Sequence, residues 1–201
     1  MFAKGRNHLE AEIDFMYDAY KGLIERVKTV YAKDLEDIRK SIESISSDAS
    51  LDDEEKDTCI SSLLEWEAEI QDKENHSRIA LFASVFSFWE QSLLRFCIFY
   101  KKKILKKNGE ENPTPKIKDY LKALLGGTNT PQISPMLTSQ LDELRNYFIH
   151  GTLTEKRKQV LDNLFESGGI NLVKCEGKYY FSSYDGLLKV LDIIKDALSK
   201  I

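Results

Sequence analysis

Residues 13–45 read IDFMYDAYKGLIERVKTVYAKDLEDIRKSIESI, and this stretch decides the fold class. Its apolar residues recur at steps of four and three, with one extra step of four, which is the near-heptad spacing of a helix that packs along another helix. We therefore expect one long helix over residues 9–47. The seam either packs within the chain's own bundle or contacts a second copy, and both interpretations stay open. Its members are Ile13, Tyr17, Tyr20, Ile24, Val27, Tyr31, Leu35, Ile38, Ile42 and Ile45.

A second helical region follows this seam. Ser50, with Asp53 three residues later, resembles a capping box and predicts a helix start near Leu51. Two apolar stripes come next and are out of phase, so we expect a bend or a boundary near residues 74–77. The first stripe is Cys59, Leu63, Trp66 and Ile70, and the second is Phe82, Phe86, Trp89, Leu93, Phe96 and Tyr100.

The apolar segment 79–100 is interrupted by Glu90 and Arg95, whereas a membrane span needs about 20 mostly apolar residues. We interpret it as the central buried helix of a bundle. Its aromatic stripe repeats at helical spacing, which favours core packing over a stacking platform for bases.

This helix is expected to run into a cluster of lysines and to end at Asn108-Gly109. The lysines either offset the dipole at the end of the helix or form a patch that attracts phosphates. In the second interpretation Lys102, Lys103 and Lys106 contact RNA.

The remainder of the chain contains shorter elements. We expect a short helix over 117–125, a helix that starts at Ser134-Pro135 and stops at His150-Gly151, and a closing helix over 187–198. Residues 170–182, with Glu176-Gly177 in the middle, predict a β-hairpin. The expected fold is mainly all-α: one domain over residues 1–201, with long N-terminal helices and a small C-terminal β-hairpin.

Composition restricts the classes of function. The formal net charge is −4, so the chain is not a generic basic nucleic-acid binder, and any RNA contact requires a local patch. The three cysteines are far apart and form no C-x-x-C pair, which argues against a zinc site and against a disulfide framework. We expect no metal, no cofactor and no membrane anchor. The first residues lack the apolar run of a signal peptide, so a cytoplasmic location is expected.

The candidate site is RNYFIHG, residues 145–151. A guanidinium stays charged and matches phosphate geometry, and an imidazole moves protons near neutral pH. Residues five apart on a helix are separated by about 140° around the axis, so Arg145 and His150 do not share a face, whereas Asn146 and His150 do. For both to meet one phosphate, either the helix end must distort at Gly151 or two copies must face each other. Two symmetric copies of such a helix would place both pairs around one cleft, which favours a homodimer.

This motif resembles that of the HEPN superfamily, whose helical domains occur in toxin–antitoxin, abortive-infection and RNA-processing systems. The family's active motif is R-x4-6-H, usually with Asn, Asp or His after the Arg, and Arg145, Asn146 and His150 match it position by position. The order of the expected helices resembles that of the family over residues 10–198. The identity of the residues resembles it only in the motif. In one subgroup the motif extends to R-x4-H-x-Y, and modification of that Tyr silences the protein. This chain has Thr152 at that position, so silencing by such a modification is not expected.

The resemblance implies a metal-independent endoribonuclease, a toxin or antiviral-defence effector, with RNA as substrate and an antitoxin or defence protein as partner. Arg145, Asn146 and His150 would be its catalytic residues. Two alternatives stay open: a HEPN-like helical dimer that binds RNA or protein without cutting, and a coiled-coil structural protein. A purely structural role of the motif also stays open, in which Arg145 pairs with Asp142 or Glu143 and His150 caps its helix. Glu90 either partners Arg145 or faces solvent.

Overall fold

The computed structural model describes residues 2–106, 109–126 and 136–201. The fold is mainly α-helical, and its only sheet in these ranges is a two-stranded hairpin, as the sequence predicts. The elements, in chain order, are α1 (Phe2–Ser47), α2 (Asp53–Phe99), α3 (Ile117–Leu125), the π-helix η2 (Met136–Gln140), α4 (Leu141–His150), α5 (Glu155–Glu166), β1 (Leu172–Cys175), β2 (Lys178–Phe181) and α6 (Tyr184–Ser199).

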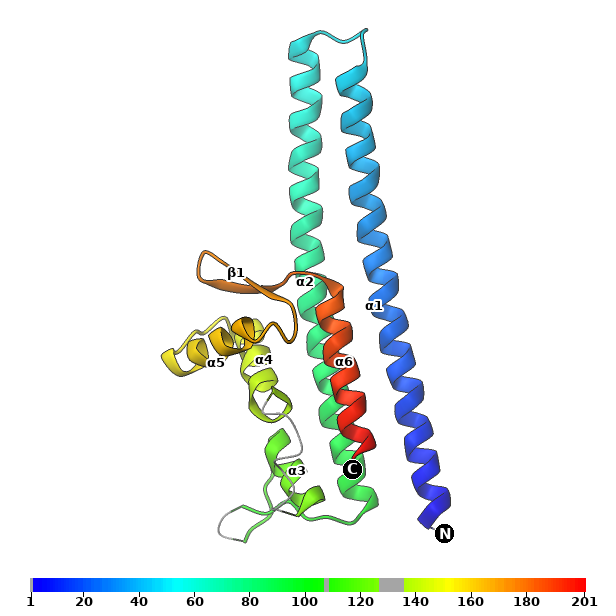
Figure 1. Ribbon diagram of the computed structural model, residues 1–201, viewed down its shortest axis with the longest axis vertical. Coiled ribbons are helices and arrows are strands. Elements are labelled where there is room, and N and C mark those ends of the chain that lie inside the picture. Colours follow the sequence, from blue (N-terminus) through cyan, green and yellow to red (C-terminus); the bar gives the residue numbers. More distant parts are fainter. Residues whose placement is uncertain (1, 107–108, 127–135) are drawn as a thin grey trace.

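α1 and α2 run antiparallel and form the axis of the molecule (Figure 1). Their far ends extend beyond all other elements as a two-helix stalk (Figure 1). We define the stalk as residues 32–76, which follow the Tyr31–Ser77 hydrogen bond and the contact of Arg78 with Tyr184 of α6. In the other half, the head, α6 packs on both α1 and α2, while α3, α4 and the hairpin lie across α2 from α1. The hydroxyl of Tyr17 on α1 donates to the carboxylate of Asp192 on α6 at 2.5 Å, and this hydrogen bond raises the pKa of Tyr17 to about 12.

The seam of α1 is confirmed as a packing surface within the chain. Ile13, Tyr17, Ile24 and Ile38 are buried, and the other members are partly buried. Because α2 and α6 cover this face, the seam is not available to a second copy of the chain. The seam therefore gives no support to a dimer, although the dimer itself stays a prediction.

The start of α2 lies two residues later than expected. Asp52 is the N-cap: its carboxylate accepts from the backbone N–H of Glu55 at 2.8 Å, and the Glu55 carboxylate accepts from the Asp52 N–H at 3.1 Å. Ser50 instead donates to Asp48 within the turn. The sequence contains two overlapping candidate capping boxes, Ser50 with Asp53 and Asp52 with Glu55. The second one forms, because its two carboxylates accept from the backbone N–H groups of both Asp52 and Glu55.

The expected boundary near residues 74–77 is wrong, because α2 is one continuous helix over Asp53–Phe99. It contains neither proline nor glycine, so nothing in the backbone interrupts it. The two stripes differ in phase because the neighbours change: Ile70 is buried in the stalk, where α1 is the partner, whereas Phe82 and Trp89 are buried in the head, where α4, β2 and α6 also pack. Trp66, counted in the first stripe, is 53% exposed.

The lysine cluster is not part of α2. The helix ends at Phe99, with Tyr100 as C-cap, and Lys101 has a φ of 50°, which turns the chain out of the helix. A helical run of these lysines would have placed like charges at i and i+4, which is unfavourable. Asn108, expected at the end of the helix, lies outside the described residues.

Candidate functional site

α4 is held on the head by its apolar side. Leu141 and Leu144 are fully buried, and the Phe148 ring lies 5.8 Å from the Phe82 ring of α2 and 5.5 Å from the Phe181 ring of β2, measured between centroids. The helix ends at His150, as the sequence predicts, because Gly151 adopts φ 64° and its N–H donates to the carbonyl of Tyr147. The expected start at Ser134-Pro135 lies outside the described residues. Before α4, residues 136–140 form a π-helical turn, a feature often found at functional sites.

Arg145 is positioned by two groups of its own chain. Its guanidinium lies 5.1 Å from the centre of the Phe86 ring, a cation–π distance, and 4.0 Å from the Asp142 carboxylate. The side chain is 32% exposed, so one part of the guanidinium is held and the other part faces solvent. The ion pair with Asp142 is the one that the non-catalytic interpretation expects.

Glu90 of α2 belongs to the same neighbourhood. Burial raises the pKa of the Glu90 carboxyl, nearby Arg145 lowers it, and nearby Asp142 raises it, with burial the largest effect. No ion pair joins Glu90 to Arg145 among the described residues. A half-buried carboxyl whose pKa is raised is a candidate member of a functional site, although structural ion-pair networks also shift pKa values.

His150 and Asn146 are accessible. The His150 side chain is exposed at the last position of α4, and Asn146 is half-buried. No hydrogen bond between described residues occupies the imidazole or the Asn146 amide, and none joins Arg145, Asn146 and His150 to one another. The chain therefore presents the three side chains along one helix with no hydrogen bond between them.

Arg157 of α5 fixes the segment that follows His150. Its Nε pairs with the Glu143 carboxylate at 2.9 Å, and another guanidinium nitrogen donates to the carbonyl of Thr152. The sequence patterns described above do not single out Arg157, because they do not predict α5. The available signal was Thr154, whose hydroxyl caps α5 by accepting from the N–H of Arg157.

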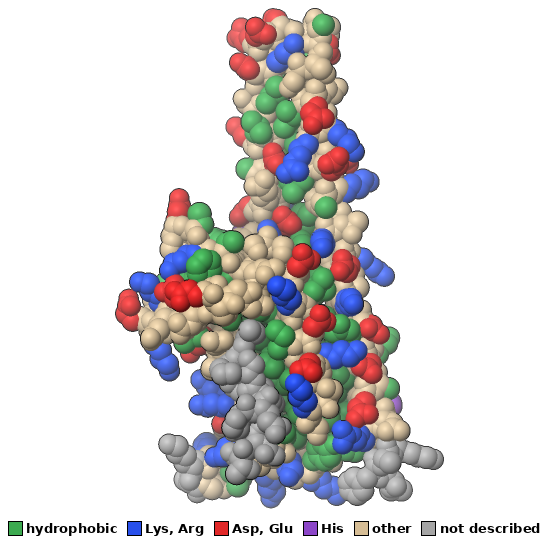
Figure 2. Space-filling model, viewed as in Figure 1, with side chains coloured by type: hydrophobic (Ala, Val, Ile, Leu, Met, Phe, Trp, Pro, Cys, Tyr) green, Lys and Arg blue, Asp and Glu red, His purple; other side chains and the backbone are tan. Residues whose placement is uncertain are grey.

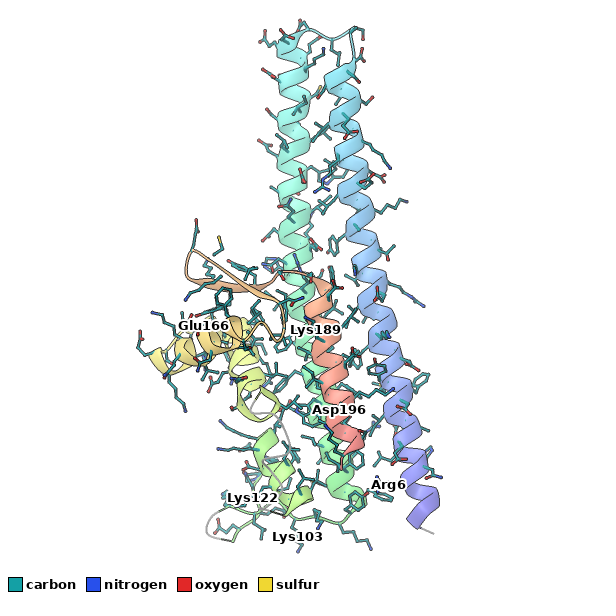
Figure 3. The ribbon with its side chains drawn as sticks, in the orientation of Figure 1. Arg6, Lys103, Lys122, Glu166, Lys189 and Asp196 are labelled. Atoms are coloured by element: carbon teal, nitrogen blue, oxygen red, sulfur yellow. The ribbon has the colours of Figure 1, made fainter. Side chains whose placement is uncertain are left out.

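The predicted RNA-binding lysines lie away from α4. Lys102, Lys103 and Lys106 are all exposed in the segment after α2, and Lys106 is 3.8 Å from Glu110. Figure 3 shows Lys103 at the end of the head opposite the stalk, where Lys122 of α3 also lies. RNA that touched both the lysines and the α4 motif would have to extend along the side of α3.

The acidic charge of the chain is concentrated in the stalk. Residues 32–76 carry fifteen Asp and Glu but only five Lys and Arg. The other 156 residues therefore carry eighteen Asp and Glu and twenty-four Lys and Arg. Figure 2 shows acidic side chains at the tip of the stalk and basic ones near the base of the head. The head is thus net basic, and the overall charge of −4 does not oppose RNA binding there.

Within the described ranges, no three His, Cys, Asp or Glu side chains are grouped so that they could hold a metal ion. No helix in the part of the chain that the structure describes combines the length and apolarity needed to cross a membrane. Comparison with protein-family models, curated proteins and solved structures gives no match.

Proposed function

We propose that this protein is a HEPN-type endoribonuclease, a toxin or antiviral-defence effector that cleaves RNA without a metal. The observation that carries the proposal is the arrangement at the end of α4: an exposed His150 follows an Arg145 whose guanidinium is held on an aromatic ring and still reaches solvent. The net basic head supports an RNA substrate. An antitoxin or defence protein that restrains the activity completes the proposal.

In this mechanism the 2′-oxygen of the RNA attacks the neighbouring phosphorus, and the bond to the 5′-oxygen breaks. His150 takes the proton of the 2′-hydroxyl as general base, or gives a proton to the leaving 5′-oxygen as general acid. Arg145 stabilises the charge that builds on the phosphoryl oxygens. Asn146 orients the imidazole or a phosphate oxygen. Two copies that bring their α4 helices to one cleft would supply the convergence that a single helix lacks.

The alternative function is a HEPN-like module that binds RNA or protein and does not cut. One observation favours it: Arg145 already has partners in Asp142 and Phe86 of its own chain. The two functions differ in a direct way, because only the enzyme releases shorter RNA products.

Cleavage is expected to persist in excess EDTA, because the proposed chemistry uses side chains alone. The measurement is the rate at which purified protein converts a labelled RNA to products, with and without chelator, in protein freed of metal beforehand. Activity that disappears with EDTA and returns with a divalent ion would contradict this mechanism. RNA that is bound but not cut in both conditions would support the alternative.

Lys102→Ala and Lys103→Ala are expected to weaken RNA binding modestly and to reduce its dependence on salt. Each lysine that contacts a phosphate releases counterions, so its loss should lower the slope of log K against log salt by about one. Binding is measured by fluorescence anisotropy across a salt series. Lys189→Ala on α6, which removes an equal charge far from these lysines (Figure 3), is the matched control. An unchanged slope in both lysine variants would show that Lys102 and Lys103 do not contact the RNA.

A further inference from the structure

Ser92 of α2 is the only polar, non-aromatic residue among the buried ones that the structure describes, with 2% of its surface exposed. It shares one side of the helix with large buried side chains, which follow one another at steps of four, three, four and four. Those neighbours are Leu81, Val85, Phe88 and Phe96. A small hydroxyl side chain therefore stands where the pattern of this side predicts a large apolar one.

The hydroxyl of Ser92 forms no hydrogen bond with any described residue. Other serines and threonines of α1 and α2 donate to the carbonyl four residues earlier in the same helix. They are Thr29, Ser41, Ser46, Ser47, Thr58, Ser62 and Ser84. A buried polar group without a hydrogen bond is uncommon because it costs free energy, and a bound molecule would supply the missing bond.

Ser92 lines a groove of about 140 Å³ that α1 and α2 form between them. Its other buried or partly buried walls are apolar or aromatic: Ile13, Met16, Tyr20 and Phe88. The rings of Tyr20 and Phe88 lie 5.5 Å apart, measured between centroids. An apolar cavity of about 150 Å³ holds benzene, whereas pockets for drug-sized molecules measure roughly 300–1,000 Å³. The groove therefore has room for one benzene-sized ring.

The charges at this groove already neutralise each other. Glu12 of α1 and Arg95 of α2 form an ion pair that joins the two helices, and their side chains are 43% and 46% exposed. The remaining polar lining, Ser87 and Gln91, is exposed and uncharged. A charged ligand would have to break the ion pair, whereas a neutral ligand leaves it intact.

We propose that this groove binds a small neutral molecule that consists of one apolar ring with one hydroxyl group. The ring contacts Ile13, Met16 and Phe88, and the hydroxyl forms a hydrogen bond with Ser92. This division of roles is typical of small-molecule sites, where apolar walls give affinity and a few polar groups fix the orientation. The site is separate from the motif of α4, which lies across α2 from α1 (Figure 1). The proposal goes beyond the ribonuclease and does not depend on it.

The test is an amide NMR titration of the isotope-labelled intact protein with phenol and, separately, with benzene. The wild type is expected to bind both at millimolar concentration, with signal shifts centred on the residues that line the groove. Ser92→Ala should weaken the binding of phenol about three- to tenfold, the effect of one lost hydrogen bond, and leave that of benzene unchanged. Ser84→Ala is the matched control, because this hydroxyl of the same helix already donates to the carbonyl of Ala80.

Ser92→Leu fills the groove with the kind of side chain that its neighbours on α2 carry, and it should abolish the binding of both compounds. Circular dichroism verifies that the helices remain, and Ser92→Ala, which adds no bulk, decides the test if leucine does not fit. A loss in Ser92→Ala that is specific to phenol would support the proposal. Absence of binding by the wild type, equal losses for phenol and benzene, or shifts confined to other parts of the protein would overturn it.

Discussion

His150→Ala and Arg145→Ala are each expected to remove nearly all RNA cleavage. General acid–base catalysis contributes typically 10²–10⁴-fold, and a guanidinium that stabilises the transition state contributes a similar factor. Because the two groups act on one phosphate as a unit, the double variant should be little slower than either single one. The measurement is the single-turnover rate on a labelled RNA, together with growth of cells that express each variant.

The matched control for this experiment is His76→Ala. His76 lies on the stalk, exposed, and its loss should change neither cleavage nor growth. Both site variants should stay folded, because His150 is exposed and Arg145 lies beside the core, not within it. An undiminished rate in His150→Ala would refute the catalytic role and leave the binding module as the function.

Phe82→Ala is expected to lower the free energy of unfolding by about 3–5 kcal/mol, the range for a large aromatic truncated in a packed core. Phe82 is fully buried, and its ring lies within 6.4 Å of those of Phe86, Phe148 and Phe181, measured between centroids. It therefore joins α2 to α4 and to β2. Chemical denaturation at one fixed chain concentration measures the effect, since self-association would otherwise contribute.

Trp66→Ala provides the comparison, because it removes a larger aromatic from an exposed position on the same helix. Trp66→Ala is expected to change the free energy of unfolding by no more than about 0.5 kcal/mol. Equal losses in the two variants would mean that the stalk is packed against something that the protomer does not contain. A small loss in Phe82→Ala would mean that α4 is not anchored through this ring.

The sequence predicts the long helices well and their ends less well. The period of residues 13–45 extends over many turns, so one misplaced residue does not hide it. A helix start depends on a few polar residues, and around Ser50 and Asp52 two caps compete within three positions. The neighbours of α2 change along its length, and a change of neighbours produces the same shift of phase as a bend.

The candidate site was predictable only in part. The end of α4 follows from local chemistry, because Gly151 takes the left-handed conformation that favours glycine. The groups that hold Arg145 and the loop after His150 have no such local signal. Phe86 comes from a helix much earlier in the chain, and Arg157 belongs to a short, charged helix whose apolar residues are few. Contacts of this kind exist only once the chain has folded.

The position of α6 has a consequence for how the chain acquires its structure. α1 and α2 meet through a short turn, so their hairpin can form early, from contacts close along the chain. The head needs a pairing between Tyr17 and Asp192, which are 175 residues apart. The hairpin of α1 and α2 therefore emerges from the ribosome before α6 is synthesised. Until then, the apolar surface that this hairpin contributes to the head is exposed and prone to aggregation. Completion of the bundle by α6 is the step expected to set the folding rate.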